Sequence, residues 1–403
     1  MPPPLDTAKA RGYTWREMNL RLAHISDTHL GFQDLDCVNS EGVNVREADI
    51  YAAWREAVDL VIQEKPDAVV HTGDFFHRPC PSNRALIQGL SGLKRLSEAK
   101  IPVIIIAGNH STPRTVYTSP ILQSFRSLDL VYPVFQETYE QVTIGDAVFH
   151  GVPHINDEER AVTELRRTKP VPGKFNILML HTSVGADYLM EEYGERVLPK
   201  ELSCILDDFS YTALGHFHSM KQVSKSGRVW YSGSTERMNE KDAGKEKGFL
   251  FVTLAHDNKP EIRFIPLSIR PWLSFSADSC EKKTAENILA EIGAFSKSEK
   301  HADAIVSILL SGLKPSQSLG LPNNEIAAMF PKALSVRTRR IFREEQFSFE
   351  HRDIRKESLF ELFGEYAREN TDSPMEAKEL MNTIKKYFAE PDLSGSTDTG
   401  GRP

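Results

Sequence analysis

The chain has 403 residues, which is long enough for one large domain and one or two smaller ones. Its contents of 40% hydrophobic and 26% charged residues are ordinary for a soluble globular protein. The net charge of −7 excludes a protein whose whole surface attracts nucleic acid or an acidic membrane, so DNA would have to bind at a locally positive region.

The cysteines and the N-terminal segment bear on the compartment. The four cysteines lie far apart and form no CxxC pair, which argues against a thiolate zinc site and a disulfide framework. The N-terminal segment lacks the apolar core of a signal peptide, and no apolar run is as long as a membrane span. We therefore expect a cytoplasmic protein with no membrane partner.

The region from residue 20 to about residue 266 alternates short β-rich runs with helical patterns. Its first part predicts strand, helix, strand, helix and strand over residues 20–26, 48–64, 67–72, 83–99 and 102–107. Apolar residues recur at helical spacing in 48–64, whereas the segment PVIIIA at 102–107 is apolar on both faces, as in a strand buried between two layers. This order predicts a βαβαβ unit.

After about residue 130 the pattern changes to hairpin-like strands. We expect them over residues 141–144, 147–152, 175–180, 211–214, 228–231, 248–254 and 261–265. Parallel units followed by antiparallel ones predict two packed mixed β-sheets flanked by helices, a four-layer α/β sandwich.

The remainder of the chain predicts smaller units. Strand and helix patterns over residues 271–343 indicate a small α+β domain, and a charged linker covers 344–357. Two amphipathic patterns over 358–390 predict a helical hairpin, the second opening with a capping box at Ser373. We expect tails at 1–19, before the large domain of 20–270, and at 391–403, where the sequence is disordered in character.

Polar side chains follow five strands of the large domain at the point where each strand ends. They are Asp27 and His29, Asp74 and His77, Asn109 and His110, His181, and finally His216 and His218. Because ligand sites of open α/β sheets form at the carboxyl ends of strands, we expect these side chains to converge at one edge. By contrast, His24 and His71 lie inside strands, and we interpret them as hydrogen-bonded core residues.

The types of side chain indicate a metal centre. Two carboxylates, one amide and four imidazoles without a thiolate suit a pair of divalent ions such as Mn, Fe or Zn. Two such ions and the carboxylates of Asp27 and Asp74 leave a charge of roughly +2, which attracts a phosphate. The expected site therefore fits a phosphoester substrate.

The order DxH, GDxxH, GNH, H and GHxH resembles the calcineurin-like metallophosphoesterases. Within them, the chain is most similar to the SbcD-type nuclease subunits of DNA double-strand-break repair, through HISDTHLG, HTGDFFHRP, IAGNH, LHTSVGADYL, ALGHFH and YSGSTER. The resemblance implies a DNA-capping domain at 271–343 and an ATPase-binding hairpin at 358–390. It also implies DNA, an SbcC-type ATPase and a second copy of the chain as partners.

The resemblance also implies roles for single residues. One ion, expected to be Mn²⁺, would be held by Asp27, His29, Asp74 and His218. The second would be held by Asp74, which bridges, and by Asn109, His181 and His216. An activated water would attack the phosphorus in line, with His110 assisting the leaving oxygen and His77 close to the substrate strand.

One position departs from the family pattern. The family usually has an aspartate after GNH, where it supports the histidine, and this chain has Ser111. Catalysis should therefore be slower, unless another group supports His110.

Alternatives stay open for the substrate and the outer contacts. The chain would be a DNA nuclease, a stand-alone phosphoesterase acting on a small phosphodiester or phosphomonoester, or a scaffold that kept the fold without the chemistry. We expect Arg78, Arg337 and Arg339 to contact DNA, although Arg337 and Arg339 also fit a solvated strand face. The chain has no GxxxxGK[ST] motif, so any dependence on ATP would come from another chain.

Overall fold

The computed structural model describes residues 19–113, 119–190, 195, 197–255 and 259–343, together with isolated positions between 364 and 381. The chain divides into two compact units, residues 1–343 and residues 344–403. The predicted linker, both predicted tails apart from residue 19, and most of the predicted hairpin lie outside the described residues.

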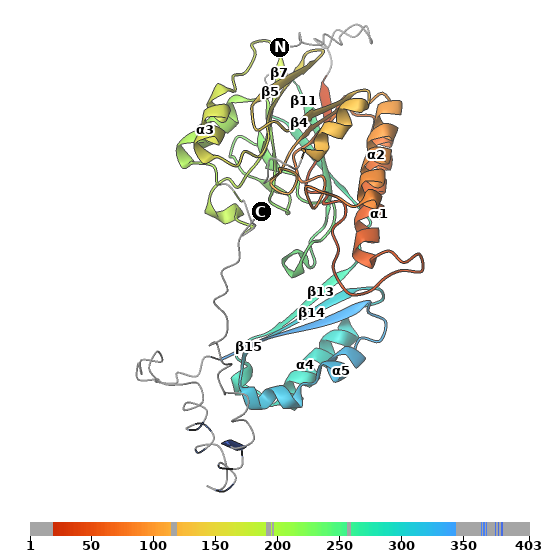
Figure 1. The fold of residues 1–403 in the computed structure, drawn as a ribbon, viewed down its shortest axis with the longest axis vertical. Helices are drawn as coiled ribbons and strands as arrows, with labels where there is room; N and C mark the ends of the chain where they lie inside the picture. The colour runs from red at the N-terminus through yellow and green to blue at the C-terminus, as the bar shows by residue number, and fades with distance from the viewer. Residues whose placement is uncertain are drawn as a thin grey trace, which may run out of the picture. The chain divides into compact units, whose positions relative to one another are not determined.

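Two six-stranded sheets form the body of the first unit (Figure 1). The first sheet has the spatial order β12 (Glu261–Pro266), β11 (Gly248–Leu254), β1 (Leu20–Ile25), β2 (Ala68–His71), β3 (Val103–Ile106) and β4 (Val131–Val134). The second has the order β5 (Glu140–Ile144), β6 (Ala147–Val152), β7 (Phe175–His181), β8 (Tyr211–Gly215), β10 (Val229–Tyr231) and β9 (Lys221–Gln222). Both sheets contain parallel and antiparallel pairs, so the predicted pair of mixed sheets is confirmed.

Helices cover the outer faces of the two sheets (Figure 1). On one side lie α1 (Val45–Glu64) and α2 (Asn83–Glu98), and on the other lies α3 (Glu158–Arg167) with the 3₁₀ helix η5 (Lys200–Asp208). The α1 helix begins three residues earlier than expected, because the Asn44 side chain accepts hydrogen bonds from the first backbone N–H groups.

Three hydrophobic clusters separate the four layers. Ile25 and Val69 of the first sheet pack with Trp54 of α1 in one cluster. A second lies between the sheets, where Val70 packs with Met179, and a third joins the second sheet to α3 and η5. Strands in the centre of a sheet, such as β3, are therefore buried on both faces, as the apolar segment at 102–107 predicted.

The expectation of antiparallel strands after residue 130 is wrong for the centre of the second sheet. There β6, β7, β8 and β10 run parallel to one another. The α3 helix lies between β6 and β7 in the chain, and η5 lies between β7 and β8, so these helices supply the crossovers that parallel strands need. The α3 sequence EERAVTELRR has few apolar residues, which is why its helical pattern escaped detection.

Within the first unit, the segment from residue 271 to residue 343, here called the small unit, has its own sheet and its own core. The strands β13 (Trp272–Ala277), β14 (Ile305–Leu313) and β15 (Ser335–Phe342) form a parallel sheet. The helices α4 (Ala285–Ser298) and α5 (Asn323–Ala328) lie along one face of it (Figure 1). The predicted domain boundary after residue 270 stays a prediction.

In the second unit, the backbone is helical at seven described positions: Gly364, Tyr366, Arg368, Met375, Lys378, Leu380 and Met381. A Cβ atom added at Gly364 would lie 3.1 Å from the Met381 Cε atom, so the chain folds back on itself here. In neither unit do the described residues include a helix long and apolar enough to cross a membrane. All four cysteines are free thiols.

Candidate metal centre

The predicted ligands converge at one edge of the sandwich, where strands from both sheets end. The loops after β1, β2 and β3 come from the first sheet, and the ends of β7 and β8 come from the second. The seven predicted ligands are all buried: Asp27, His29, Asp74, Asn109, His181, His216 and His218. His77 and His110 are half-buried at the same edge, so both can be reached from solvent.

The backbone is strained where it presents these side chains. Asp27, His29, Asp74 and His216 have positive φ angles of 51°, 46°, 49° and 94°, which residues other than glycine rarely adopt. Hydrogen bonds between neighbouring loops hold this conformation, since Asp27 N donates to the Gly73 carbonyl and His29 N donates to the Asp74 carbonyl. The loops after β1 and β2 thus form one rigid pair.

Asp27, His29 and His218 form a first group of metal-binding atoms within 4.8 Å of one another. The His29 and His218 Nε2 atoms lie 3.2 Å apart. Burial holds the pKa of His29 well below its ordinary value, so the ring is neutral and Nε2 can offer a lone pair. Two imidazole nitrogens that converge beside the Asp27 carboxylate are typical of a site that binds a cation.

Asp27, Asp74 and His181 form a second group within 4.8 Å. The His181 Nδ1–H group donates to the Thr72 carbonyl at 2.7 Å, so Nε2 carries the lone pair of the neutral ring. This Nε2 atom lies 3.1 Å from Asp74 Oδ2 and 2.9 Å from Asn109 Oδ1, both of which accept hydrogen bonds. When the ring is neutral, three acceptor atoms therefore face one another, so the group needs either a proton on Nε2 or a cation between these atoms.

The electrostatics of this group also favour a cation. Burial alone would lower the pKa of His181, but the carboxylates of Asp74 and Asp27 raise it to about 9. Burial and the neighbouring Asp74 raise the pKa of Asp27 to about 7. A buried group of side chains that binds an extra proton so firmly can bind a divalent ion in its place. The carboxylate, amide and imidazole donors of the group are also types that bind divalent ions.

His216 lies beside the second group but outside both sets of converging atoms. Its ring centroid is 5.3 Å from that of His181, and its backbone N–H donates to the Asp27 carboxylate at 3.1 Å. Its Nε2 atom, however, lies 2.8 Å from Glu195 Oε1. Glu195 was missed by sequence reasoning, because one acid among several between His181 and Pro199 carries no local signal.

His110 is supported by the backbone of His77. The His110 Nδ1–H group donates to the His77 carbonyl at 2.9 Å, and the two rings stack with centroids 5.0 Å apart. Ser111 is buried, and its Oγ atom has no hydrogen-bond partner among the described residues. The ring of His110 is thus held through the carbonyl of His77 and not through Ser111.

The ring of His77 contacts a predicted ligand. His77 Nδ1 lies 3.3 Å from His29 Nδ1, while the Nε2 atom of His29 faces His218. With an ion on Nε2 of His29, the Nδ1–H group would donate a hydrogen bond to His77. His77 therefore orients both His29, through its ring, and His110, through its carbonyl.

A buried lysine holds the backbone of another predicted ligand. Lys247 Nζ donates to the His218 carbonyl at 2.6 Å, to Ser234 Oγ at 2.9 Å and to Asp242 Oδ1 at 2.8 Å. Sequence reasoning missed Lys247 as well, because it lies 29 residues after His218 in the chain.

The two histidines inside strands are core residues, as predicted. His24 lies between the Tyr211 hydroxyl and Thr72 Oγ1, and His71 contacts Thr28 Oγ1. Burial lowers the pKa of both rings to about 3, so they stay neutral.

The predicted DNA-contacting arginines lie outside the metal centre. Arg78 follows His77 and is exposed. Arg337 and Arg339 occupy the same exposed face of β15. Arg337 pairs with Asp34 at 2.6 Å and Arg339 pairs with Glu240 at 3.0 Å, and both partners belong to the body of the first unit.

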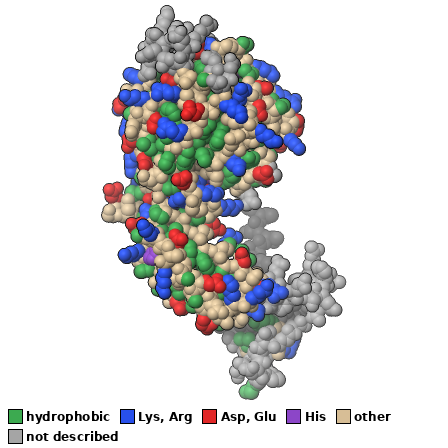
Figure 2. Space-filling view, turned by 180° about the vertical axis from the view of Figure 1, so that it is seen from behind, with side chains coloured by type: hydrophobic (Ala, Val, Ile, Leu, Met, Phe, Trp, Pro, Cys, Tyr) green, Lys and Arg blue, Asp and Glu red, His purple; other side chains and the backbone are tan. Residues whose placement is uncertain are grey.

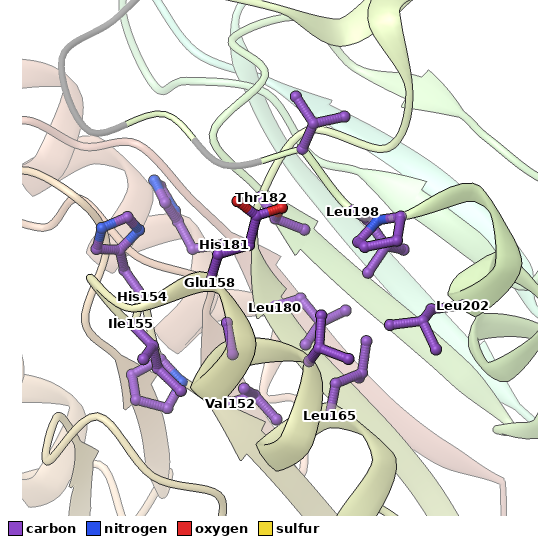
Figure 3. A pocket seen from close by; sticks show the side chains of 15 residues that line it. Val152, His154, Ile155, Glu158, Leu165, Leu180, His181, Thr182, Leu198 and Leu202 are labelled. Carbon is purple, nitrogen blue, oxygen red and sulfur yellow. The ribbon is translucent and has the colours of Figure 1, made fainter.

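An apolar pocket lies behind the centre, between β6, β7, α3 and η5 (Figure 3). Its wall consists mainly of apolar side chains such as Ile155, Leu165, Leu180 and Leu198. Of the converging ligands only His181 reaches it, so the pocket is separate from the place where the ligands meet.

Known proteins share this arrangement of motifs. Residues 20–220 match the family model described as calcineurin-like phosphoesterase. The chain is 30% identical over 309 residues to the DNA double-strand break repair protein Mre11 of Sulfolobus acidocaldarius, which covers 73% of this chain and 76% of the relative. It is 27% identical over 367 residues to the protein of the same name in Methanococcus maripaludis, covering 87% and 91%.

A third relative agrees with these two. The Mre11 protein of Sulfurisphaera tokodaii is 33% identical over 267 residues, covering 62% of this chain and 63% of the relative. The similarity includes the strand-end motifs that carry the converging side chains. The chain therefore belongs to the calcineurin-like phosphoesterases, within the family of the Mre11 DNA double-strand break repair proteins.

Proposed function

We propose that the protein is a two-metal-dependent nuclease that hydrolyses phosphodiester bonds at DNA ends, as the SbcD-like partner of an SbcC-type ATPase in double-strand-break repair. The observation that carries the proposal is the convergence of two buried groups of metal-binding atoms around Asp27 and Asp74, with His110 at their accessible side. The Mre11 relatives, described as DNA double-strand break repair proteins, supply the substrate class.

The proposed assignment of ligands follows the two groups. Asp27, His29, Asp74 and His218 would hold one ion. Asp74, Asn109, His181 and His216 would hold the other. Asp74 Oδ2 lies 3.1 Å from His181 Nε2 and 3.9 Å from His29 Nε2, which supports its role as the bridge.

The chemistry divides between the ions and the protein. Two divalent ions, for which we propose Mn²⁺, would polarise the phosphoryl oxygens and make a water molecule a better nucleophile. His110 would give a proton from Nε2 to the leaving oxygen, since its Nδ1–H group is held by the His77 carbonyl. The strained loops keep the ligands in place before substrate arrives, so little reorganisation is needed.

The outer parts of the chain would bind macromolecular partners. We propose that residues 271–343 cap the DNA, with Arg337 and Arg339 on the exposed face of β15 and Arg78 beside the centre. We propose residues 358–390 as the ATPase-binding hairpin, supported by the exposed Tyr366 and Met375 at helical positions. A homodimer and a cytoplasmic location complete the proposal.

The test is Mn²⁺-dependent cleavage of end-labelled duplex and single-stranded DNA, with hydrolysis of bis-p-nitrophenyl phosphate and metal content measured in parallel. We expect cleavage by the wild type, and a loss of about 10²- to 10⁴-fold in His110→Ala with metal content unchanged. His301→Ala, which changes a histidine of the small unit in contact with Phe330, serves as the control and should keep hydrolysing the small diester.

Two results would contradict the proposal. Hydrolysis of the small diester without DNA cleavage, even with the ATPase added, would favour a stand-alone phosphoesterase. No hydrolysis of either substrate, with two ions bound, would favour a scaffold without chemistry.

A further inference from the structure

The loop that follows β7 brings a carboxylate to a predicted metal ligand. Glu195 Oε1 lies 2.8 Å from His216 Nε2, although 21 residues separate them in the chain. The Glu195 side chain is largely buried, with an exposed fraction of 9%, and that of His216 is 2% exposed. The contact is therefore shielded from solvent, where water weakens a hydrogen bond to a carboxylate less than at the surface.

The protein holds this carboxylate in place independently of His216. The backbone N–H of Met190 donates to Glu195 Oε1 at 2.8 Å, and the Ser183 hydroxyl donates to the same atom at 2.6 Å. The loop closes next to these donors, where Leu198 N donates to the Ser183 carbonyl at 2.7 Å. Glu195 is thus preorganised toward His216.

The geometry decides which nitrogen of His216 is available for an ion. A carboxylate only accepts hydrogen bonds, so His216 must carry its proton on Nε2 to bond Glu195. The lone pair of the neutral ring is then on Nδ1. Ligation through Nδ1 with Nε2–H bonded to a carboxylate is a recurrent arrangement of metal-binding histidines, and it makes the imidazole a stronger ligand.

We infer that Glu195 is a positioning residue for the metal centre: it fixes the orientation and the tautomer of His216, so that His216 binds the second ion through Nδ1. The inference rests on the proposed two-metal centre and adds a residue that no strand-end motif contains. His216 would then be fixed at two points, by Glu195 at the ring and by the Asp27 carboxylate at the backbone N–H.

A purely structural role for the contact makes a different prediction. If His216 only anchors the loop, removing the carboxylate loosens the loop and leaves metal affinity unchanged. If Glu195 positions the ligand, the same change weakens one ion selectively. Metal affinity measured site by site therefore separates the two roles.

The experiment is calorimetric titration of the metal-free full-length protein with Mn²⁺. We expect the wild type to bind two ions, and Glu195→Gln to bind one of them about ten- to a hundred-fold more weakly while the other is unchanged. Glu201→Gln is the matched control, since it makes the same chemical change at an exposed carboxylate of η5. It should keep both affinities near those of the wild type.

A double-variant cycle tests whether Glu195 acts through His216. In the His216→Ala background, Glu195→Gln should cause no further loss of affinity, because the ligand it positions is already gone. The inference would be overturned if Glu195→Gln reduced metal affinity as much in the His216→Ala background as in the wild type, or if Glu195→Gln alone kept wild-type affinities. Neither result would contradict the two-metal centre. A wild type that binds fewer than two ions would instead overturn the proposed function.

A second measurement needs no variant. In cadmium-loaded wild-type protein, nitrogen NMR should show His216 coupled to cadmium through Nδ1, with a proton on Nε2. Coupling through Nε2 would overturn the inference even if Glu195→Gln failed to fold.

Discussion

At the scale of single residues, a backbone carbonyl accepts the hydrogen bond that orients His110. His110 Nδ1–H donates to the carbonyl of His77, so its ring is oriented although Ser111 follows it. A backbone carbonyl is positioned by the chain itself, so accepting this hydrogen bond needs no side-chain ordering. The orientation of His110 therefore depends on the loop that carries His77, and for this reason we expect catalysis to tolerate Ser111.

The protonation of His181 predicts how the metal-free protein responds to pH. Its pKa is raised from 6.5 to about 9 in the folded chain, chiefly by Asp74 acting against the effect of burial. Between these values the folded chain binds more protons than the unfolded chain, so the free energy of unfolding falls as pH rises. The stabilisation is complete below pH 6.5 and is lost as pH rises through about 9.

We expect the free energy of unfolding of the metal-free protein to fall by on the order of 1–3 kcal/mol across this range. Unfolding in urea at each pH measures it, and the urea midpoint should fall in parallel. His181→Gln, which cannot take up the proton, should show a smaller fall. Saturating Mn²⁺ should raise stability most at high pH, because the ion replaces the proton. A metal-free midpoint that rises between pH 6.5 and 9 would contradict the assignment.

At the scale of elements, close approaches of backbone bring the strand ends together. A Cβ atom at Gly108, directly after the end of the β3 run, would lie 2.2 Å from Asp74 Oδ1 and 2.6 Å from Asp74 N. A Cβ atom at Gly215, at the end of β8, would lie 2.0 Å from the Thr72 carbonyl oxygen. Glycine is required at both positions for space, since any side chain would push the ligand loops apart.

Gly108→Ala should therefore displace the Asp74 carboxylate and weaken the binding of both ions. Gly293→Ala in α4 is the matched control, because the added methyl group would meet only Met329 Sδ at 3.9 Å. It should stabilise its helix by about 0.5–1 kcal/mol and leave metal binding unchanged. Mn²⁺ titration and thermal melting of both variants provide the readouts, and wild-type affinity in Gly108→Ala would be incompatible with the proposed bridge.

At the scale of the whole molecule, the net charge is −7, so any binding of DNA depends on where single basic residues lie. On the face shown in Figure 2, basic and acidic side chains are interspersed, in agreement with the net charge of −7. Arg337 and Arg339 are paired with Asp34 and Glu240 across the first unit. Exposed pairs of this kind contribute little to stability, so phosphates can compete for the arginines.

Arg337→Ala and Arg339→Ala should each weaken DNA binding and reduce the slope of affinity against salt by about one. Arg340→Ala is the control, because Arg340 donates to the Leu321 carbonyl and its neighbours Arg339 and Ile341 point to the opposite face. Fluorescence anisotropy with labelled duplex DNA over a series of salt concentrations gives the slopes. Unchanged slopes in the first two variants would favour a solvated strand face.

The sequence by itself determined which polar side chains follow the strand ends of the large domain, and these are the predicted ligands. Glycines and polar residues interrupt apolar runs at Asp27, Asp74 and Asn109, and this local pattern identifies both the strand and its end. The two mixed sheets followed for the same reason. The parallel order of the second sheet did not, because strand direction depends on crossovers such as the weakly patterned α3.

Only the tertiary structure decided how the predicted ligands are held. Which nitrogen of His181 faces Asp74, which carbonyl supports His110, and which carboxylate meets His216 all depend on contacts between segments distant in the chain. Hydrogen bonds of this kind leave no periodic trace in a sequence, because each needs one donor and one acceptor at a place set by the packing of the layers. For that reason, only the folded chain identifies Glu195 and Lys247 as residues that contact His216 and His218.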